Sequence, residues 1–214
     1  MVKKLNILEI KRNIDENGFH ALNDFLNNKE IELLRSYVDE KLKKNNYQYF
    51  FLTSETTKNE ILNNSEFFSK FENLLKNIVK EFNFSIRENE KLYKVLRVVT
   101  GEKSKRVSLD FHFDAHLLTL LIPIYIPERD NSDNGNLLII KNLRKITNNI
   151  FKNIIQKLFY QSNFYKKFFI NKNLSKTETL YLKPGNAYIF NGFKTLHANL
   201  NIDPKYADQQ LRTT

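Results

Sequence analysis

The chain has no cysteine and no tryptophan, and only five glycines and four prolines among its 214 residues. The absence of cysteine excludes disulfides and thiolate metal sites, so a transition metal here needs histidine or carboxylate ligands. The scarcity of Gly and Pro, with 41% hydrophobic and 27% charged residues, excludes a fibrous or disordered chain and is typical of a globular protein. The length allows one full core, and we predict a single domain over residues 1–214.

Long apolar runs are also missing. No segment approaches the roughly 18–20 apolar residues that span a bilayer, and the first thirty residues lack the apolar core of a signal peptide. We therefore expect no membrane span and a cytoplasmic location. Acidic residues are fewer than basic residues, so the formal net charge is +10 and the pI is near 9.5. This charge favours anionic partners such as nucleotides, nucleic acid, phosphorylated metabolites or acidic lipids.

Apolar spacing predicts two helices in the first ninety residues. Apolar side chains recur at near-helical spacing over residues 31–42, where Asn27 or Asn28 can cap the helix, and along one face of residues 66–82. A short strand-like segment, GFHALNDF, precedes the first helix. We predict that residues 1–90 form a helical flank whose helices cover the outside of a sheet.

From residue 91 onward the pattern changes to β-rich runs separated by short polar or Gly/Pro turns. There are about eight runs, which is the strand count of a double-sheet jelly roll. The predicted fold class is therefore α+β, with a cupin-like jelly-roll core over residues 91–214. The predicted strands are KLYKVLRVVT, VSLDFHFDAH, LLTLLIPIYIPE, GNLLII, ETLYLK, NAYIF, TLHANLNI and LRTT.

A helical insert interrupts these strands at residues 143–174, where Phe and Tyr alternate with Lys. The simplest interpretation is a helix that covers a sheet face. The alternatives are a substrate lid over the barrel mouth and a dimer surface. The sequence does not decide among them, and it does not fix the oligomeric state.

Four ionisable residues alternate along one predicted strand. Alternate residues of a strand share a face, so Asp110, His112, Asp114 and His116 lie opposite a face of phenylalanine and alanine. Four such groups inside a barrel are costly to bury unless they bind a metal, pair with one another or meet water. A solvent-facing edge strand is the alternative interpretation.

A metal site follows if a third ligand comes from elsewhere in the chain. His197, in LKPGNAYIFNGFKTLHANL, lies on another predicted strand and can join His112 and Asp114. Two imidazoles and one carboxylate form the facial triad of non-haem Fe(II) oxygenases, which leaves three coordination positions open. An isolated H-x-D triplet is weak support, because such short patterns arise by chance.

The order of these segments resembles the Fe(II)- and 2-oxoglutarate-dependent oxygenases, in which H-x-D is followed by apolar strands and a distal histidine. The segment NGFHALNDFLNNKEIELLRSYVDEKL is similar to the opening of the phytanoyl-CoA dioxygenase-like branch. The resemblance covers residues 17–214, with the helical insert as its largest departure. It implies a double-stranded β-helix and a dioxygenase that uses Fe(II), 2-oxoglutarate as co-substrate and dioxygen to hydroxylate a small molecule.

The resemblance also implies roles for single residues. His112, Asp114 and His197 match the iron ligands and thus the catalytic centre. Aspartate at position 114 favours hydroxylation over halogenation, because a halogenase of this superfamily vacates the carboxylate position for chloride. His116 is a rival ligand on the same strand face, but the family pattern favours His112 and leaves His116 either behind the ligands or facing the substrate.

The same resemblance implies a basic residue after the distal histidine, which binds the far carboxylate of 2-oxoglutarate. A guanidinium suits this role because it pairs with a carboxylate through two hydrogen bonds. Arg212 is the predicted residue, and Lys205 is the weaker alternative. Arg97, Thr119 and Tyr125 lie on predicted core strands and are further candidates for contacts with 2-oxoglutarate or substrate.

Two other functions stay open at this point. One is a non-catalytic jelly-roll module that binds an anionic ligand or nucleic acid through the Lys-rich aromatic insert. The other is a cupin-like enzyme that uses the metal without 2-oxoglutarate. We favour the oxygenase because a pure binder has no need of the triad, and the positive charge suits an anionic small-molecule substrate. No residue pattern identifies that substrate.

Overall fold

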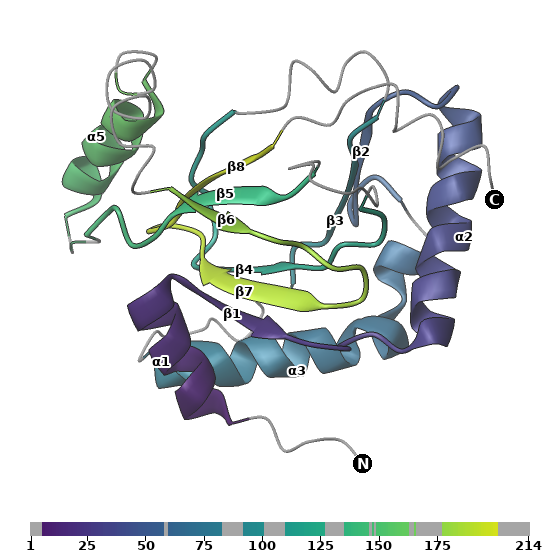
Figure 1. Cartoon of the computed structure of the whole chain (residues 1–214), viewed down its shortest axis with the longest axis horizontal. Coiled ribbons are helices and arrows are strands. Elements are labelled where there is room, and N and C mark those ends of the chain that lie inside the picture. The colour runs from purple at the N-terminus through teal and green to yellow at the C-terminus, as the bar shows by residue number, and fades with distance from the viewer. Residues whose placement is uncertain are drawn as a thin grey trace.

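The computed structural model shows a two-sheet body flanked by helices (Figure 1). Its mixed helix and sheet content confirms that part of the predicted fold class. No helix in the described ranges is long and apolar enough to cross a membrane. The structure describes residues 6–57, 60–82, 92–100, 110–126, 135–145, 147, 149–162, 165 and 177–200.

Three helices occupy the N-terminal part, namely α1 (Ile7–Asn17), α2 (Asn28–Lys44) and α3 (Ser65–Glu81). Each begins after an asparagine whose side chain accepts a backbone N–H of the first turn, which satisfies one of the otherwise unpaired donors there. The cap of α2 is Asn27, which forms a capping box with Glu30. The two predicted helices are thus confirmed to within a few residues, whereas α1 was not predicted.

Two antiparallel three-stranded sheets form the body. The first has the strand order β1-β7-β4 and the second β6-β5-β8, while β2 and β3 pair separately. The strands are β1 (Phe19–Leu22), β2 (Phe50–Thr53), β3 (Val95–Val98), β4 (Leu118–Leu121), β5 (Leu137–Ile140), β6 (Glu178–Leu180), β7 (Ala187–Asn191) and β8 (Leu196–Asn199).

The predicted strand-like segment GFHALNDF contains β1, whereas β2 in the same N-terminal flank was not predicted and pairs with β3 across more than forty intervening residues. One predicted strand needs correction. The predicted strand VSLDFHFDAH is not regular where it is described, since it pairs only through an isolated bridge between His112 and His197 and then bends at Ala115. The final predicted strand, LRTT, lies outside the described residues.

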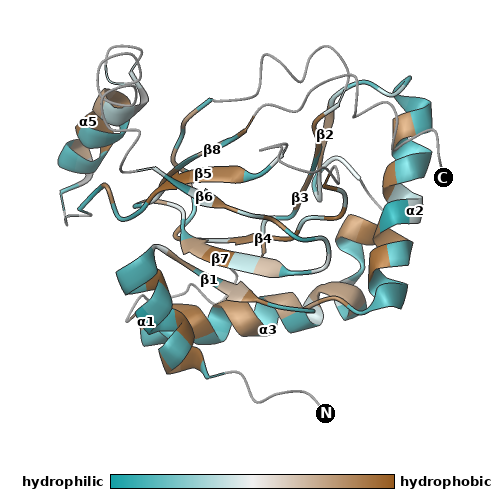
Figure 2. Ribbon diagram, viewed as in Figure 1, coloured by the Kyte–Doolittle hydropathy of each residue, from teal (hydrophilic) through white to brown (hydrophobic). Residues whose placement is uncertain are grey.

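The two sheets pack face to face through apolar side chains, with Leu137 and Ile139 of β5 against Tyr188 and Phe190 of β7. Helices α1 and α3 cover the outer face of the first sheet, and α2 packs on β2 and β3. In Figure 2 these helices carry both apolar and polar residues, as expected for helices that bury one face against a sheet. The prediction that the N-terminal helices cover the outside of a sheet is therefore confirmed.

The insert contains the helix α5 (Ile150–Gln161), as the sequence predicts. Tyr160 of α5 packs beside Phe113, and Tyr165 belongs to the same cluster on the outer side of the second sheet. Most of the other residues after Gln161 in the insert lie outside the described ranges. The helix lies beyond the ends of β5 and β8, away from α1, α2 and α3 (Figure 1).

Candidate metal centre

The three predicted ligands meet because of simple alternation along two extended segments. Phe111 and Phe113 are buried in the cluster on the outer side of the second sheet, so the intervening His112 and the following Asp114 face the opposite side. In β8 the flanking residues Leu196 and Ala198 belong to that same outer cluster, which turns His197 inward as well.

Backbone hydrogen bonds hold the two segments together at this point. The amide N–H groups of His112 and His197 each donate to the carbonyl oxygen of the other residue, at 3.0 and 3.1 Å. The imidazole rings are 4.5 Å apart, measured between centroids. The two histidines are 85 residues apart in the sequence, and this antiparallel bridge holds them side by side.

The donor atoms surround one point. Asp114 Oδ1 lies 3.9 Å from His112 Nε2 and 3.5 Å from His197 Nε2, and the three ligand atoms lie within 4.8 Å of one another. Two ligands at right angles on an octahedral ion, with bonds of about 2.1 Å, are about 3 Å apart. Shifts on the order of 1 Å would thus bring these atoms to coordination distances, and the donor set of two imidazoles and a carboxylate fits a divalent ion such as Fe(II).

Both imidazoles are oriented by their other nitrogen. His112 Nδ1 lies 2.8 Å from the carbonyl oxygen of Asp110, and His197 Nδ1 lies 3.1 Å from that of Thr195. A carbonyl oxygen can only accept, so each Nδ1 carries the proton and donates. In the neutral ring each Nε2 then has its lone pair free, which is the arrangement that second-shell partners impose on histidines that bind metals.

The carboxylate of Asp114 is oriented as well. The hydroxyl of Thr119 in β4 donates to Asp114 Oδ2, which leaves Oδ1 facing the two histidines. The backbone N–H of Asp114 donates to the carbonyl oxygen of Gly192 at 3.0 Å. One carboxylate oxygen is therefore engaged by the protein, and the other is available to an ion.

Gly192 permits this packing because it has no side chain. A Cβ atom at this position would lie 2.6 Å from the carbonyl oxygen of His116, 2.7 Å from Asp114 Cβ and 2.8 Å from Thr119 Oγ1. These distances are shorter than van der Waals contact. The sequence analysis missed this residue, although a glycine two residues after the predicted strand NAYIF is a signal of close backbone approach.

Burial lowers the pKa of His197 below its ordinary value, while the nearby Asp114 carboxylate partly opposes this shift. The positive charge of Arg97 adds to the lowering. A lowered pKa keeps the ring neutral at neutral pH, and the neutral ring is the form that can coordinate a metal.

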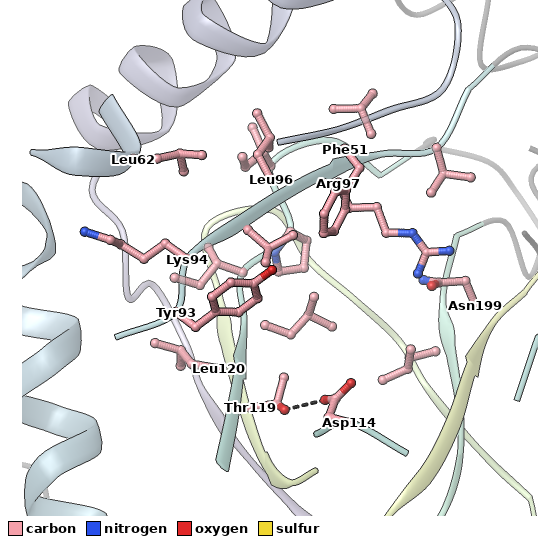
Figure 3. Close-up of a pocket in the computed structure, with 18 of the residues that line it drawn as sticks. Phe51, Leu62, Tyr93, Lys94, Leu96, Arg97, Asp114, Thr119, Leu120 and Asn199 are labelled. Carbon is pink, nitrogen blue, oxygen red and sulfur yellow. Dashed lines mark hydrogen bonds between the residues drawn. The ribbon is translucent and has the colours of Figure 1, made fainter. Parts of the chain in front are cut away.

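A cavity of about 770 Å³ opens beside the triad. Its walls are mostly apolar side chains from α2, α3, β3 and β4, and the triad lines one part of it. Figure 3 shows Asp114 and Thr119 at this wall, while Arg97 of β3 extends toward Asn199 of β8. Tyr93 and His116 also line the cavity, and their rings stack with centroids 5.2 Å apart and planes 11° from parallel.

The other predicted site residues lie in different situations. His116 is not part of the ligand cluster, which contains His112 as the family pattern favoured. Arg97 and Thr119 line the cavity. Tyr125 also lines it, but its hydroxyl donates to both Asp39 oxygens at 3.0 Å, and burial and this bond raise its pKa to about 12. Arg212 and Lys205 lie outside the described residues.

No protein-family model matches the chain. Among solved structures, a prolyl-4-hydroxylase from Pseudomonas putida is similar with a TM-score of 0.57 and 8% identity, covering 92% of each chain. A second is SnoK, a non-haem α-ketoglutarate-dependent carbocyclase from nogalamycin biosynthesis, with a TM-score of 0.58 and 12% identity, covering 94% of this chain and 80% of SnoK. Identities this low show a shared fold, and the phytanoyl-CoA dioxygenase-like branch is not established by these similarities.

Proposed function

We propose that the chain is a non-haem Fe(II)- and 2-oxoglutarate-dependent dioxygenase that hydroxylates an anionic small molecule. The observation that carries the proposal is the cluster of His112, Asp114 and His197, whose free donor atoms face one point at the wall of a large cavity. The shared fold with two oxidative enzymes, one of them dependent on α-ketoglutarate, supports it. The proposal includes two finer points: that the fold is a double-stranded β-helix and that the chain is a member of the phytanoyl-CoA dioxygenase-like branch.

When bound here, Fe(II) would supply the oxidative chemistry by which dioxygen converts 2-oxoglutarate to succinate and CO₂ and leaves one oxygen atom on the substrate. The protein's own residues would do the positioning. The carbonyl oxygens of Asp110 and Thr195 would keep both imidazoles in the coordinating tautomer, and Thr119 would hold the carboxylate of Asp114 in one orientation. The apolar walls would exclude water from the reacting carbon.

The co-substrate needs a cation for its far carboxylate, and Arg97 and Arg212 are the two candidate residues. Arg97 lines the cavity, and within the described part of the chain its guanidinium forms no ion pair. A guanidinium without a protein partner beside a metal centre is suited to bind a carboxylate. Thr119 and Tyr125 would contribute only indirectly, because their hydroxyls already bond to Asp114 and Asp39.

The substrate class follows from the walls of the cavity. Among the described lining residues, Lys94, Arg97 and Lys157 are cationic, and Asp114 is the one carboxylate. The Nζ atom of Lys94 lies 4.8 Å from the centroid of the Phe68 ring. The charge of Arg97, in contrast, acts on the triad, because it lowers the pKa of His197. A molecule with an apolar body and an anionic group would match this lining.

The test measures succinate formation and oxygen uptake together, in protein supplied with Fe(II) and 2-oxoglutarate. The proposal expects slow succinate formation without substrate, faster formation with an apolar anionic substrate, and loss of both in Asp114→Ala. An enzyme that used the metal without 2-oxoglutarate would consume oxygen without forming succinate. A binding module would do neither, and either outcome would overturn the proposal.

The two arginines can be separated in the same assay. If Arg97 binds the co-substrate, Arg97→Ala should raise the KM for 2-oxoglutarate at least about tenfold, while Arg212→Ala leaves it unchanged. The reverse result would assign the role to Arg212. An unchanged KM for 2-oxoglutarate in both variants would contradict both assignments.

A further inference from the structure

The helix α5 presents its apolar side chains to solvent. Five of its large apolar residues are 49–78% exposed. Four of them, Phe151, Ile154, Ile155 and Leu158, are spaced at i, i+3, i+4 and i+7. Residues at this spacing lie on one side of a helix, so they form a continuous face. This apolar α5 face consists of Phe151, Ile154, Ile155, Leu158 and Phe159.

The opposite side of α5 holds the helix in this orientation. Asn153, Gln156, Lys157 and Tyr160 are partly buried against the body of the protein. The guanidinium of Arg144 donates to the carbonyl oxygen of Asn153 at 2.8 Å. The helix therefore turns its more polar side inward and its apolar side outward, which is the reverse of an ordinary surface helix.

The sequence segment that contains this helix carries charges of one sign. Between Asp133 and Glu178 the sequence contains nine Lys and Arg residues and no Asp or Glu. The rest of the chain has 25 Lys and Arg against 24 Asp and Glu, so this segment accounts for almost all of the net charge of +10. On α5 itself, Lys152 is exposed beside the apolar face, whereas Lys157 belongs to the opposite, partly buried side.

We propose that the apolar α5 face docks on an anionic lipid surface. A helix with an exposed apolar face, an exposed lysine beside it and a lysine-rich neighbouring sequence is suited to lie in the interface of a bilayer, where hydrocarbon covers the apolar side chains and acidic headgroups pair with the lysines. Two copies of the chain meeting through this segment would bring like charges together. Single-stranded nucleic acid stacks on aromatic rings, whereas three of the five residues of the face, Ile154, Ile155 and Leu158, offer no ring.

The position of α5 connects this surface with the candidate metal centre. Lys157 of α5 also lines the cavity. The polar side of α5 therefore borders the cavity, while its apolar face points away from the body of the protein. The docking itself does not depend on the proposed oxygenase activity, and its test needs neither metal nor 2-oxoglutarate.

The experiment is co-sedimentation of the full chain with vesicles of phosphatidylcholine alone or of phosphatidylcholine mixed with phosphatidylserine. We expect binding to the mixed vesicles and little binding to phosphatidylcholine alone. Added salt should weaken this binding, since screening reduces the attraction between lysines and acidic headgroups. Equal and weak sedimentation with both kinds of vesicle would overturn the proposal.

Matched variants locate the binding surface. Leu158→Asn should weaken binding to the mixed vesicles roughly tenfold or more, because a leucine side chain no longer enters the hydrocarbon. Leu8→Asn is the control, since Leu8 of α1 and Leu158 are both 65% exposed. Lys152→Glu should weaken binding more than Lys29→Glu, although both change the net charge equally. Equal effects of the α5 variants and their controls would contradict the docking surface.

Two other occupants would be recognised by their own signals. Light scattering after size exclusion would reveal a dimer that Leu158→Asn converts to a monomer if the face binds a second copy. A gel-shift assay with single-stranded RNA would reveal binding that Phe151→Ser and Lys152→Glu remove if the face binds nucleic acid. Either result in place of vesicle binding would overturn the proposal. Circular dichroism of each variant checks that the fold is kept.

Discussion

The candidate metal centre and the apolar α5 face depart from the usual distribution of side chains in opposite ways. At the metal centre, ionisable groups lie at least partly inside the protein: His197 is almost fully buried, and His112 and Asp114 are partly buried. On α5, large apolar groups lie outside, and Phe151 is 78% exposed. In α3 the usual distribution holds, since this helix buries Phe71, Leu74 and Ile78.

We propose that both departures serve a component from outside the chain. Taking a carboxylate and two imidazoles partly or fully out of water costs free energy unless an ion compensates their desolvation. Exposing an apolar stripe costs free energy unless another surface covers it. Departures of this kind are expected at functional sites, where the chain gives up local stability for binding. The predictions below separate the two regions by their responses to substitution.

The largest effect is expected from the loss of a metal ligand. His197→Ala should lower 2-oxoglutarate-dependent succinate formation at least about a hundredfold, because loss of an outer-shell partner alone can cost that much. The control is His20→Ala, since His20 is a partly buried histidine that contacts Asn13 and lies outside the ligand cluster. Equal activity in the two variants would contradict the assignment.

The next effect concerns the space beside Asp114. Gly192→Ala should weaken the affinity for Fe(II) about ten- to a hundredfold, because the new Cβ atom would displace Asp114 or Thr119. Anaerobic titration calorimetry measures the affinity. Thermal unfolding with and without ion distinguishes a displaced ligand from a general loss of the fold. An unchanged affinity would mean that the close approach of Gly192 does not position the carboxylate.

A smaller effect is expected at Thr119. Thr119→Val keeps the shape of the side chain but removes the hydroxyl that donates to Asp114 Oδ2, so the affinity for Fe(II) should fall roughly tenfold. Thr119→Ser retains the hydroxyl and should restore most of the affinity. If serine and valine behave alike, the hydrogen bond does not orient the ligand.

The smallest effect is expected on α5. Leu158→Ala should change the free energy of unfolding by less than about 0.5 kcal/mol, because the side chain is exposed. Leu74→Ala in α3 should cost about 2–5 kcal/mol, because Leu74 is buried between α3 and the first sheet. Urea denaturation of both variants measures the difference. A large loss for Leu158→Ala would place that side chain in the core and remove the contrast between the two helices.

Much of this architecture could be predicted from local patterns. The helices α2 and α3 have long apolar stripes and asparagine caps, and the H-x-D alternation fixes a shared face for His112 and Asp114. The helix α1 was missed because its apolar positions, Ile10 and Ile14 among them, are diluted by charged and amide residues. Its stability comes from contact with α3, which no local pattern reveals.

The features that could not be predicted depend on contacts between distant segments. The strand β2 has four residues and is defined by pairing with β3. The importance of Gly192 appears only when Asp114 and Thr119 are known to pack against it. The outward orientation of α5 was likewise unpredictable, because an amphipathic pattern gives a face but not the direction in which that face points.

The account rests on convergence of His112, Asp114 and His197 on a single divalent ion. Anaerobic titration of the full chain with Fe(II), followed by calorimetry, tests this most directly when wild type and Asp114→Ala are compared. The account predicts one ion bound per chain in the wild type and at least about a hundredfold weaker binding in the variant. Absence of binding in the wild type, or the same affinity in both proteins, would contradict it.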